Sequence, residues 1–165
     1  MINIMVRIII YLIFILFSCL SANANKIQDC FYECCFGSSY DEIMGKLVLQ
    51  DYEVEKHASY LAVEGVFFGG VYFDKVLFRF KKNVFYCIEF YSDDNNDTQE
   101  LHRKIVNKYN CFNIKDISAS ACDDLGRSVF SCFVSIDRYK YVLSYKDERL
   151  YDCLLYTSPS PRDTE

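Results

Sequence analysis

The sequence predicts an α+β fold: an antiparallel sheet of about five to six strands with two helices packed on one face. Long stretches alternate apolar and polar residues, as half-buried strands do. Two other stretches repeat their apolar residues at the helical period. Aromatic residues, which favour strands, make up 17% of the 165-residue chain. Apolar residues at 52% and charged residues at 25% exclude a disordered chain.

The first helix is expected from Ser39 to about Gln50. Ser39 and Glu42, three residues apart, form the pattern of a capping box at a helix start. One apolar stripe at helical spacing follows, made of Tyr40, Ile43, Met44 and Leu47.

The second helix is expected to begin at Asp97, with Glu100 three residues later, and to end at Asn110. Its apolar stripe consists of Leu101, Ile105 and Tyr109. Asparagine is a common helix stop because it tolerates the left-handed conformation there.

Strands are expected in the ranges 52–55, 59–67, 71–81, 84–91, 129–136 and 139–145. Lys82 and Asn83 leave only two residues between the two longest strands, which makes that pair an antiparallel hairpin. The stretch from Cys111 to Cys122 shows no clear period and is expected to be a looser connection. No internal repeat and no linker is visible, so residues 38–152 are expected to form one domain.

The N-terminus has the pattern of an export signal. One positive charge, Arg7, precedes an apolar run of about ten residues, which is short for a membrane span. Small residues before Asn25 place the cleavage after Ala24, so residues 1–24 would be the signal peptide and 25–37 a polar, Cys-rich lead-in. A second interpretation is a bacterial lipobox ending at Cys19, which would then carry a lipid. The protein is therefore expected to be periplasmic or secreted, with lipid anchoring in the envelope as the alternative.

The C-terminal residues 153–165 contrast with the rest in composition, and both prolines of the chain lie here. Eleven consecutive residues from Cys153 resemble one reading frame of a transposase-based sequencing adapter. This resemblance implies an environmental fragment whose native end is replaced, and a domain that is truncated. A natural Ser/Pro tail is the alternative.

The net charge is −5. A general nucleic-acid binder needs a basic face, so this balance argues against nucleic acid as a partner. The expected partner is a protein or an envelope component, and a membrane is expected to be contacted only through the signal or a lipid anchor. No cofactor is expected, because the sequence contains no Gly-rich phosphate loop and no metalloprotease pattern.

Nine cysteines are present, and seven lie between the signal and the tail. Two disulfides are candidates: Cys111 with Cys122, which flank one loop, and Cys30 with Cys34 or Cys35. Cys87 and Cys132 lie within expected strands, where a free cysteine usually acts as a small buried hydrophobe. A zinc site at Cys30, Cys34 and Cys35 is less favoured, because a second ligand pair at zinc spacing is missing.

The sequence shows no catalytic motif, and we expect a protein that is not an enzyme. His102 follows Leu101 on the second helix and is expected to be a solvated surface group, while His57 is expected in a turn between strands. The acidic loop 93–97 could attract calcium, but a solvated loop that caps a helix explains its residues better.

The order of elements resembles that of small exported bacterial proteins of unknown function, many of them from gut bacteria. The resemblance rests on a strand with the pattern Glu-Gly-x-Phe-x-Gly, here starting at Glu64, and on a helix ending in Lys108-Tyr109. The family usually has Gly next, where this chain has Asn110. The resemblance implies fold and export, and no activity. At the level of fold alone, the layout is also similar to β-lactamase-inhibitor and outer-membrane-assembly lipoprotein domains.

Three hypotheses follow. The first is an exported non-catalytic protein that binds a protein or envelope component through its sheet. The Tyr-rich strand 139–145 and the pair Phe67-Phe68 are its candidate recognition residues, with ordinary sheet packing as the alternative. The second hypothesis is a lipid-anchored envelope protein of similar body, attached at Cys19. The third is a small hydrolase that uses a cysteine or a carboxylate.

Overall fold

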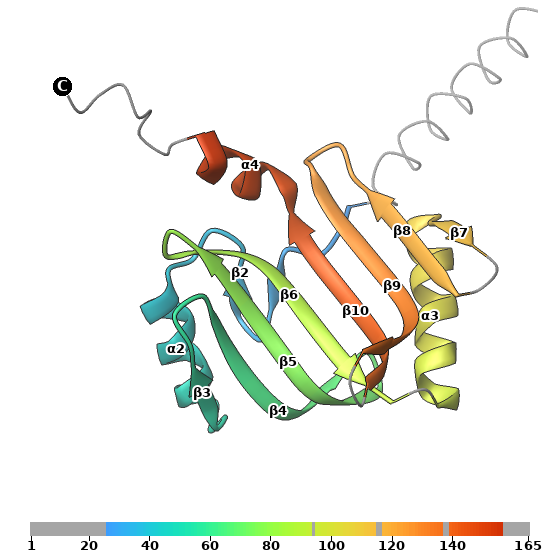
Figure 1. Ribbon diagram of the computed structural model, residues 1–165, viewed down its shortest axis with the longest axis horizontal. Helices are drawn as coiled ribbons and strands as arrows, with labels where there is room; N and C mark the ends of the chain where they lie inside the picture. The colour runs from blue at the N-terminus through green and yellow to red at the C-terminus, as the bar shows by residue number, and fades with distance from the viewer. Residues whose placement is uncertain (1–25, 94, 115–116, 137–138, 157–165) are drawn as a thin grey trace, which may run out of the picture.

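A computed structural model describes residues 26–93, 95–114, 117–136 and 139–156, and its main element is an eight-stranded antiparallel sheet (Figure 1). The expected signal, its cleavage at Ala24, the lipid site at Cys19 and residues 157–165 lie outside these ranges. No helix within the described ranges is long and apolar enough to cross a membrane. The elements are β1 (Cys30–Phe31), β2 (Cys34–Cys35), α2 (Tyr40–Leu49), β3 (Val54–Lys56), β4 (Tyr60–Phe68), β5 (Val71–Lys81), β6 (Val84–Ser92), α3 (Asn96–Tyr109), β7 (Phe112–Ile114), β8 (Ser118–Cys122), β9 (Arg127–Ile136), β10 (Tyr139–Asp147) and α4 (Glu148–Tyr156).

The antiparallel α+β class is confirmed, but the expected five to six strands are too few. The main sheet has eight, in the order β3-β4-β5-β6-β10-β9-β8-β7. The stretch expected to be a loose connection contains β7 and β8 instead. β8 has the sequence Ser-Ala-Ser-Ala-Cys, whose small residues produce no alternation of large apolar and polar side chains, and β7 has only three residues.

Between the β1–β2 hairpin and α4, the described elements follow the same order twice, although the sequence shows no visible internal repeat. In each half a helix is followed by four strands: α2 then β3 to β6, and α3 then β7 to β10. The two four-stranded units meet where β6 pairs with β10. α2 lies beside β3 at one end of the sheet, and α3 lies beside β8 at the other (Figure 1).

Both helices begin at polar caps, although the second cap differs from the expected one. The Ser39 side chain accepts a hydrogen bond from the Glu42 N–H, as expected. In α3 the cap is Asn95 rather than Asp97. The Asn95 side chain accepts from the Thr98 N–H while the Thr98 hydroxyl accepts from the Asn95 N–H, so both groups are satisfied. Asn110 ends α3 in the left-handed conformation, at φ 49°, as expected.

The hairpin of β5 and β6 has the expected two-residue turn. Lys82 and Asn83 have φ of 47° and 67°, the pair of positive values that matches the twist of the flanking strands. Lys81 and Val84 are therefore direct partners, and the two strands pair over most of their length.

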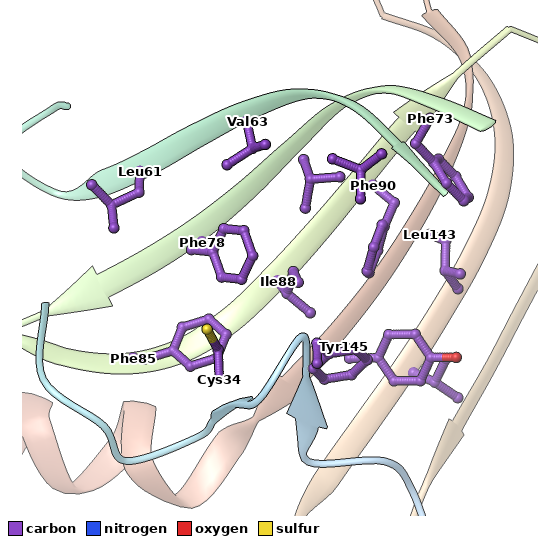
Figure 2. Close-up of a cluster of buried hydrophobic side chains, with 14 of the residues drawn as sticks. Cys34, Leu61, Val63, Phe73, Phe78, Phe85, Ile88, Phe90, Leu143 and Tyr145 are labelled. Atoms are coloured by element: carbon purple, nitrogen blue, oxygen red, sulfur yellow. The ribbon is translucent and has the colours of Figure 1, made fainter. Parts of the chain in front are cut away.

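A single apolar core lies on one face of the sheet, which we call the inner face (Figure 2). Both helices contribute to it, through Ile43 and Leu47 of α2 and through Leu101, Ile105 and Tyr109 of α3. The lead-in, expected to be polar, also supplies core residues: Ile27, Phe31 and Cys34 are all buried. The segment before the first helix is therefore part of the fold rather than a leader to it.

The last described element, α4, has no counterpart in the sequence expectation. It follows β10 directly, and the Asp147 carboxylate accepts a hydrogen bond from the Leu150 N–H in its first turn. The Tyr151 ring lies between the ammonium groups of Lys81 and Lys146, at 4.0 and 4.1 Å from its centre. These contacts hold α4 against the ends of the middle strands, near the end of β5 and the end of β10.

Candidate functional site: the outer face of the sheet

The outer face, opposite the core, carries one row of residues that crosses all eight strands. In the strand register, each of these residues is the direct partner of the next one on the neighbouring strand. The row is Glu55, Ala62, Leu77, Glu89, Ser144, Phe130, Ser120 and Phe112. Directly opposed residues project from the same face, so the row runs along the outer face. Ala62 and Leu77 within the row are buried.

At the β7 end of this row, two phenylalanines are exposed to solvent. Phe112 is 74% exposed and Phe130 is 44% exposed. Between them in the strand register lies Ser120, which has a small side chain. Exposed aromatic side chains on a sheet face are common in protein-binding surfaces, because they offer large apolar contact at small entropic cost.

Around β5, β6 and the start of β10, polar and aromatic side chains on the outer face hold one another in place. The Arg79 Nε donates to the Glu89 carboxylate at 2.7 Å, and the Tyr91 hydroxyl donates to the same carboxylate at 2.7 Å. The Tyr91 ring lies 5.4 Å from the Tyr139 ring. Burial, together with the hydrogen bond to Glu89, raises the pKa of Tyr91 to about 12. The tyrosine therefore stays protonated and remains a donor.

Two hollows lie beside this network and share Glu64. The larger, of about 650 Å³, is lined by residues 51–55, Ala62, Glu64 and Gly65. The smaller, of about 310 Å³, is lined by Glu64, Tyr72, Asp74, Asp93 and Tyr139. Both are open to solvent and carry carboxylates, so their lining suits a cationic group.

Gly65 shapes the junction between the hollows. Its φ is +70°, a conformation that residues with a Cβ rarely adopt, and a Cβ there would lie 3.1 Å from the Tyr72 hydroxyl. The Tyr72 ring therefore lies close over β4. Phe67, which is 69% exposed, meets this ring edge-on at 5.2 Å. The Glu-Gly-x-Phe pattern seen in the sequence thus lies at the hollows, and it is the signal by which this part of the site could be found.

The Tyr-rich strand 139–145 divides between the two faces. A break in the register between Tyr139 and Tyr141 turns Tyr139 to the outer hollow. Tyr141 and Tyr145 are fully buried in the core. Of the pair expected to recognise a partner, Phe67 is exposed and Phe68 packs against the core. Ordinary sheet packing is therefore the role of Tyr141, Tyr145 and Phe68.

The disulfide of the structure joins Cys30 to Cys35, not to Cys34. Cys30 and Cys35 are direct partners in the β1–β2 hairpin, whereas Cys34 lies opposite Phe31 and points into the core. Successive residues of a strand face opposite sides, so only one of the two adjacent cysteines can reach Cys30. Of the two pairings expected for Cys30, the structure therefore has the one with Cys35 and not the one with Cys34, and the linked thiols also argue against the zinc interpretation.

The expected pairing of Cys111 with Cys122 is also wrong, since both are free thiols. Phe112 lies opposite Ser120, so Cys122 shares the outer face with Ser120, while Cys111 packs against the core. The two sulfurs therefore lie on opposite faces. Cys87 and Cys132 are buried free cysteines, as expected, and burial raises the pKa of Cys87 to about 12.

His102 is buried, which corrects the expectation of a solvated group. Its Nδ1 is hydrogen-bonded to the Ser131 hydroxyl at 2.8 Å, and this hydroxyl is bonded to the Tyr141 hydroxyl at 2.7 Å. The buried residues of α3 include Thr98, Leu101, His102 and Ile105, whose helical spacing is the signal for this burial. The network ties α3 to β9 and β10.

His57 lies in the turn between β3 and β4, as expected. Its Nε2 is 2.8 Å from the Glu55 carboxylate, and its ring stacks on Tyr60 at 4.1 Å. Within the acidic loop, Asn95 caps α3 and Asp93 lines the smaller hollow. Across the part of the chain that the structure describes, no three His, Cys, Asp or Glu side chains are grouped so as to hold a metal ion.

Comparisons of this chain with protein-family models, with curated proteins and with solved structures find no match.

Proposed function

We propose that this is an exported, non-catalytic protein that binds a partner protein on the outer face of its sheet. The observation that carries the proposal is the cross-strand row that ends in the exposed rings of Phe130 and Phe112. The same face bears Tyr72 and Tyr139 beside two hollows. Such a mixture of exposed rings and fixed polar groups is typical of protein-binding surfaces.

Side chains on the outer face are held in place by one another, and this supports the proposal. Arg79, Glu89 and Tyr91 are joined by hydrogen bonds, and Tyr139 is held against Tyr91. Side chains already fixed in the free protein lose less conformational freedom when a partner binds. The opposite face is covered by the lead-in and receives core residues from both helices, so we place the partner on the outer face.

Export is part of the proposal. A signal peptide over residues 1–24 with cleavage after Ala24 is its first form, and attachment of a lipid at Cys19 is the alternative. The Cys30–Cys35 disulfide supports either form, because disulfides persist in oxidising compartments outside the cytosol. Mass spectrometry of the mature N-terminus separates them: Asn25 as the first residue supports cleavage, and a lipid on Cys19 overturns it in favour of the anchored form.

The binding proposal is tested by selecting peptides from a random library against the full chain. The double variant F112S/F130S then removes both exposed rings without touching the core. We expect the selected peptides to lose about tenfold or more in affinity for this variant. The control is L49S, because Leu49 is exposed on α2, away from the sheet face. Peptides that bind F112S/F130S as well as the parent, or a library that yields no binder, would overturn the proposal.

A further inference from the structure

The outer face is not uniform in charge, and this bears on the chemistry of the partner that it takes. The inference here rests on the proposed function and extends it. We infer that the partner presents a basic segment, and that its Arg or Lys side chains occupy the two hollows that meet at Glu64. The apolar residues of the same partner would lie over Phe130 and Phe112.

The charge of the hollows is the first step of the argument. Carboxylates of Asp51, Glu53, Glu55 and Glu64 lie along the larger hollow. Those of Glu64, Asp74 and Asp93 lie along the smaller one. Among the described residues that line the two hollows, none has a basic side chain. The face therefore offers negative potential concentrated in two adjoining concave sites, which attracts a cation more strongly than scattered surface charges do.

Nearby basic groups offset only part of this charge. The Arg79 guanidinium is bonded to Glu89, a carboxylate that lines neither hollow. Lys75 lies opposite Glu64 in the strand register and can offset one carboxylate. His57 is bonded to Glu55, at the rim of the larger hollow. Within the part of the chain that the structure describes, most of the lining carboxylates are therefore left to be balanced by a partner.

The aromatic walls of the smaller hollow favour a cationic side chain over a free metal ion. Tyr72 and Tyr139 line it together with three carboxylates. A guanidinium or ammonium group gains from a ring face as well as from a carboxylate. Contacts with Phe67 and Tyr91 hold these two rings in place, so the site is formed before the partner arrives.

The geometry also favours one continuous segment of a protein as the occupant. Glu64 lines both hollows, so neighbouring basic residues of one chain can fill both. A second copy of this protein is disfavoured, since its net charge is −5 and its own outer face carries the same carboxylates. Nucleic acids and anionic lipids are repelled for the same reason.

The probe for the test is a fluorescent peptide of alternating Arg and Ala, with a Glu-Ala peptide of equal length for comparison. Fluorescence anisotropy measures the binding of each to the full chain. We expect the Arg peptide to bind and the Glu peptide not to bind. Binding should weaken by about tenfold in the double variant E64Q/D74N and should fall as salt is raised.

The matched control is the double variant D41N/E100Q, which removes two carboxylates from the exposed surfaces of α2 and α3. It should bind the Arg peptide within about twofold of the parent, since exposed charges beyond a Debye length are largely screened. Equal weakening by both double variants, or equal binding of the two peptides, would overturn the inference. Library-selected peptides that depend on Phe112 and Phe130 but contain no Arg or Lys would overturn it too. In that case the proposed function would still stand.

Discussion

The ring centre of Phe31, in the lead-in, lies 4.9 Å from the ring centre of Tyr145 on β10, with the two planes inclined by 52°. The ring centre of Phe31 also lies 5.8 Å from that of Phe68 and 6.1 Å from that of Phe90. One residue of the short first hairpin thus contacts strands of both halves of the sheet. It closes the core on the inner face between them.

Replacing Phe31 with Ala should cost about 3–5 kcal/mol of the free energy of unfolding, because a fully buried ring is removed and a cavity remains. Urea unfolding followed by circular dichroism measures this loss. The matched control is Phe112→Ala, which removes an exposed ring and should change stability by about 0.5 kcal/mol or less. Equal losses in the two variants would contradict the role given to Phe31.

The disulfide should stabilise this same hairpin. The double variant C30S/C35S is expected to lose about 2 kcal/mol, since the link closes a short loop and restricts the unfolded chain. Thermal unfolding of the parent with and without reductant should show the same loss. Cys122→Ser is the control, because Cys122 is an exposed free thiol. A parent that is indifferent to reductant would argue against the Cys30–Cys35 link.

Two glycines should respond in opposite ways to alanine. Gly65→Ala should destabilise the protein by about 1–2 kcal/mol, because of the positive φ and the Tyr72 hydroxyl beside its Cβ position. Gly45→Ala, inside α2 with open space around it, should stabilise the protein by about 1 kcal/mol. Urea unfolding measures both. A stabilising Gly65→Ala would show that the junction of the hollows does not need glycine.

Acid stability should depend on Asp123. Burial favours its neutral form, but N–H groups of Arg127, Ile27 and Leu125 and the Arg127 guanidinium outweigh this, so its pKa lies below the usual value. A carboxyl whose pKa is lowered by folding adds stability above its unfolded pKa and loses it as pH falls through the folded value.

Asp123→Asn should therefore reduce stability by about 2 kcal/mol at neutral pH, where the charged hydrogen bonds are lost. The difference from the parent should shrink in strong acid, where the parent carboxyl is protonated as well. Urea unfolding over a pH series measures this. Asp124→Asn, at the exposed neighbour, should give a curve parallel to that of the parent. A constant difference at every pH would rule out Asp123 as the group responsible.

The parts of the fold that could be predicted depend on local patterns. Alternation and a two-residue turn predict the β5–β6 hairpin, and Ser39 predicts the start of α2. Asn95 was missed as a cap, because Asp97 offers an equally good local pattern and only the direction of the entering chain decides between them. The strands β7 and β8 were missed because pairing with β9, not their own composition, makes them strands.

The candidate site was predictable only where its residues are close in sequence. The pattern at Glu64, Gly65 and Phe67 drew attention to one stretch of β4, and this stretch lies at the hollows. Asp51, Asp74 and Asp93 come from separate segments that only the register of the sheet brings together. In the same way, a shift of one residue in the β1–β2 register would pair Cys30 with Cys34 instead of Cys35. No local sequence pattern indicates which register the hairpin adopts.

The pairing of β6 with β10 also bears on how fast the chain folds. Within each four-stranded unit, consecutive strands can pair through short connections. Across the β6–β10 pair, partners such as Phe90 and Leu143 are about fifty residues apart in the chain. Closing a loop of that length is the slow, entropically costly step. We therefore expect substitutions in β6 and β10 to slow refolding. Substitutions in the strands at the edges of the sheet should mainly accelerate unfolding.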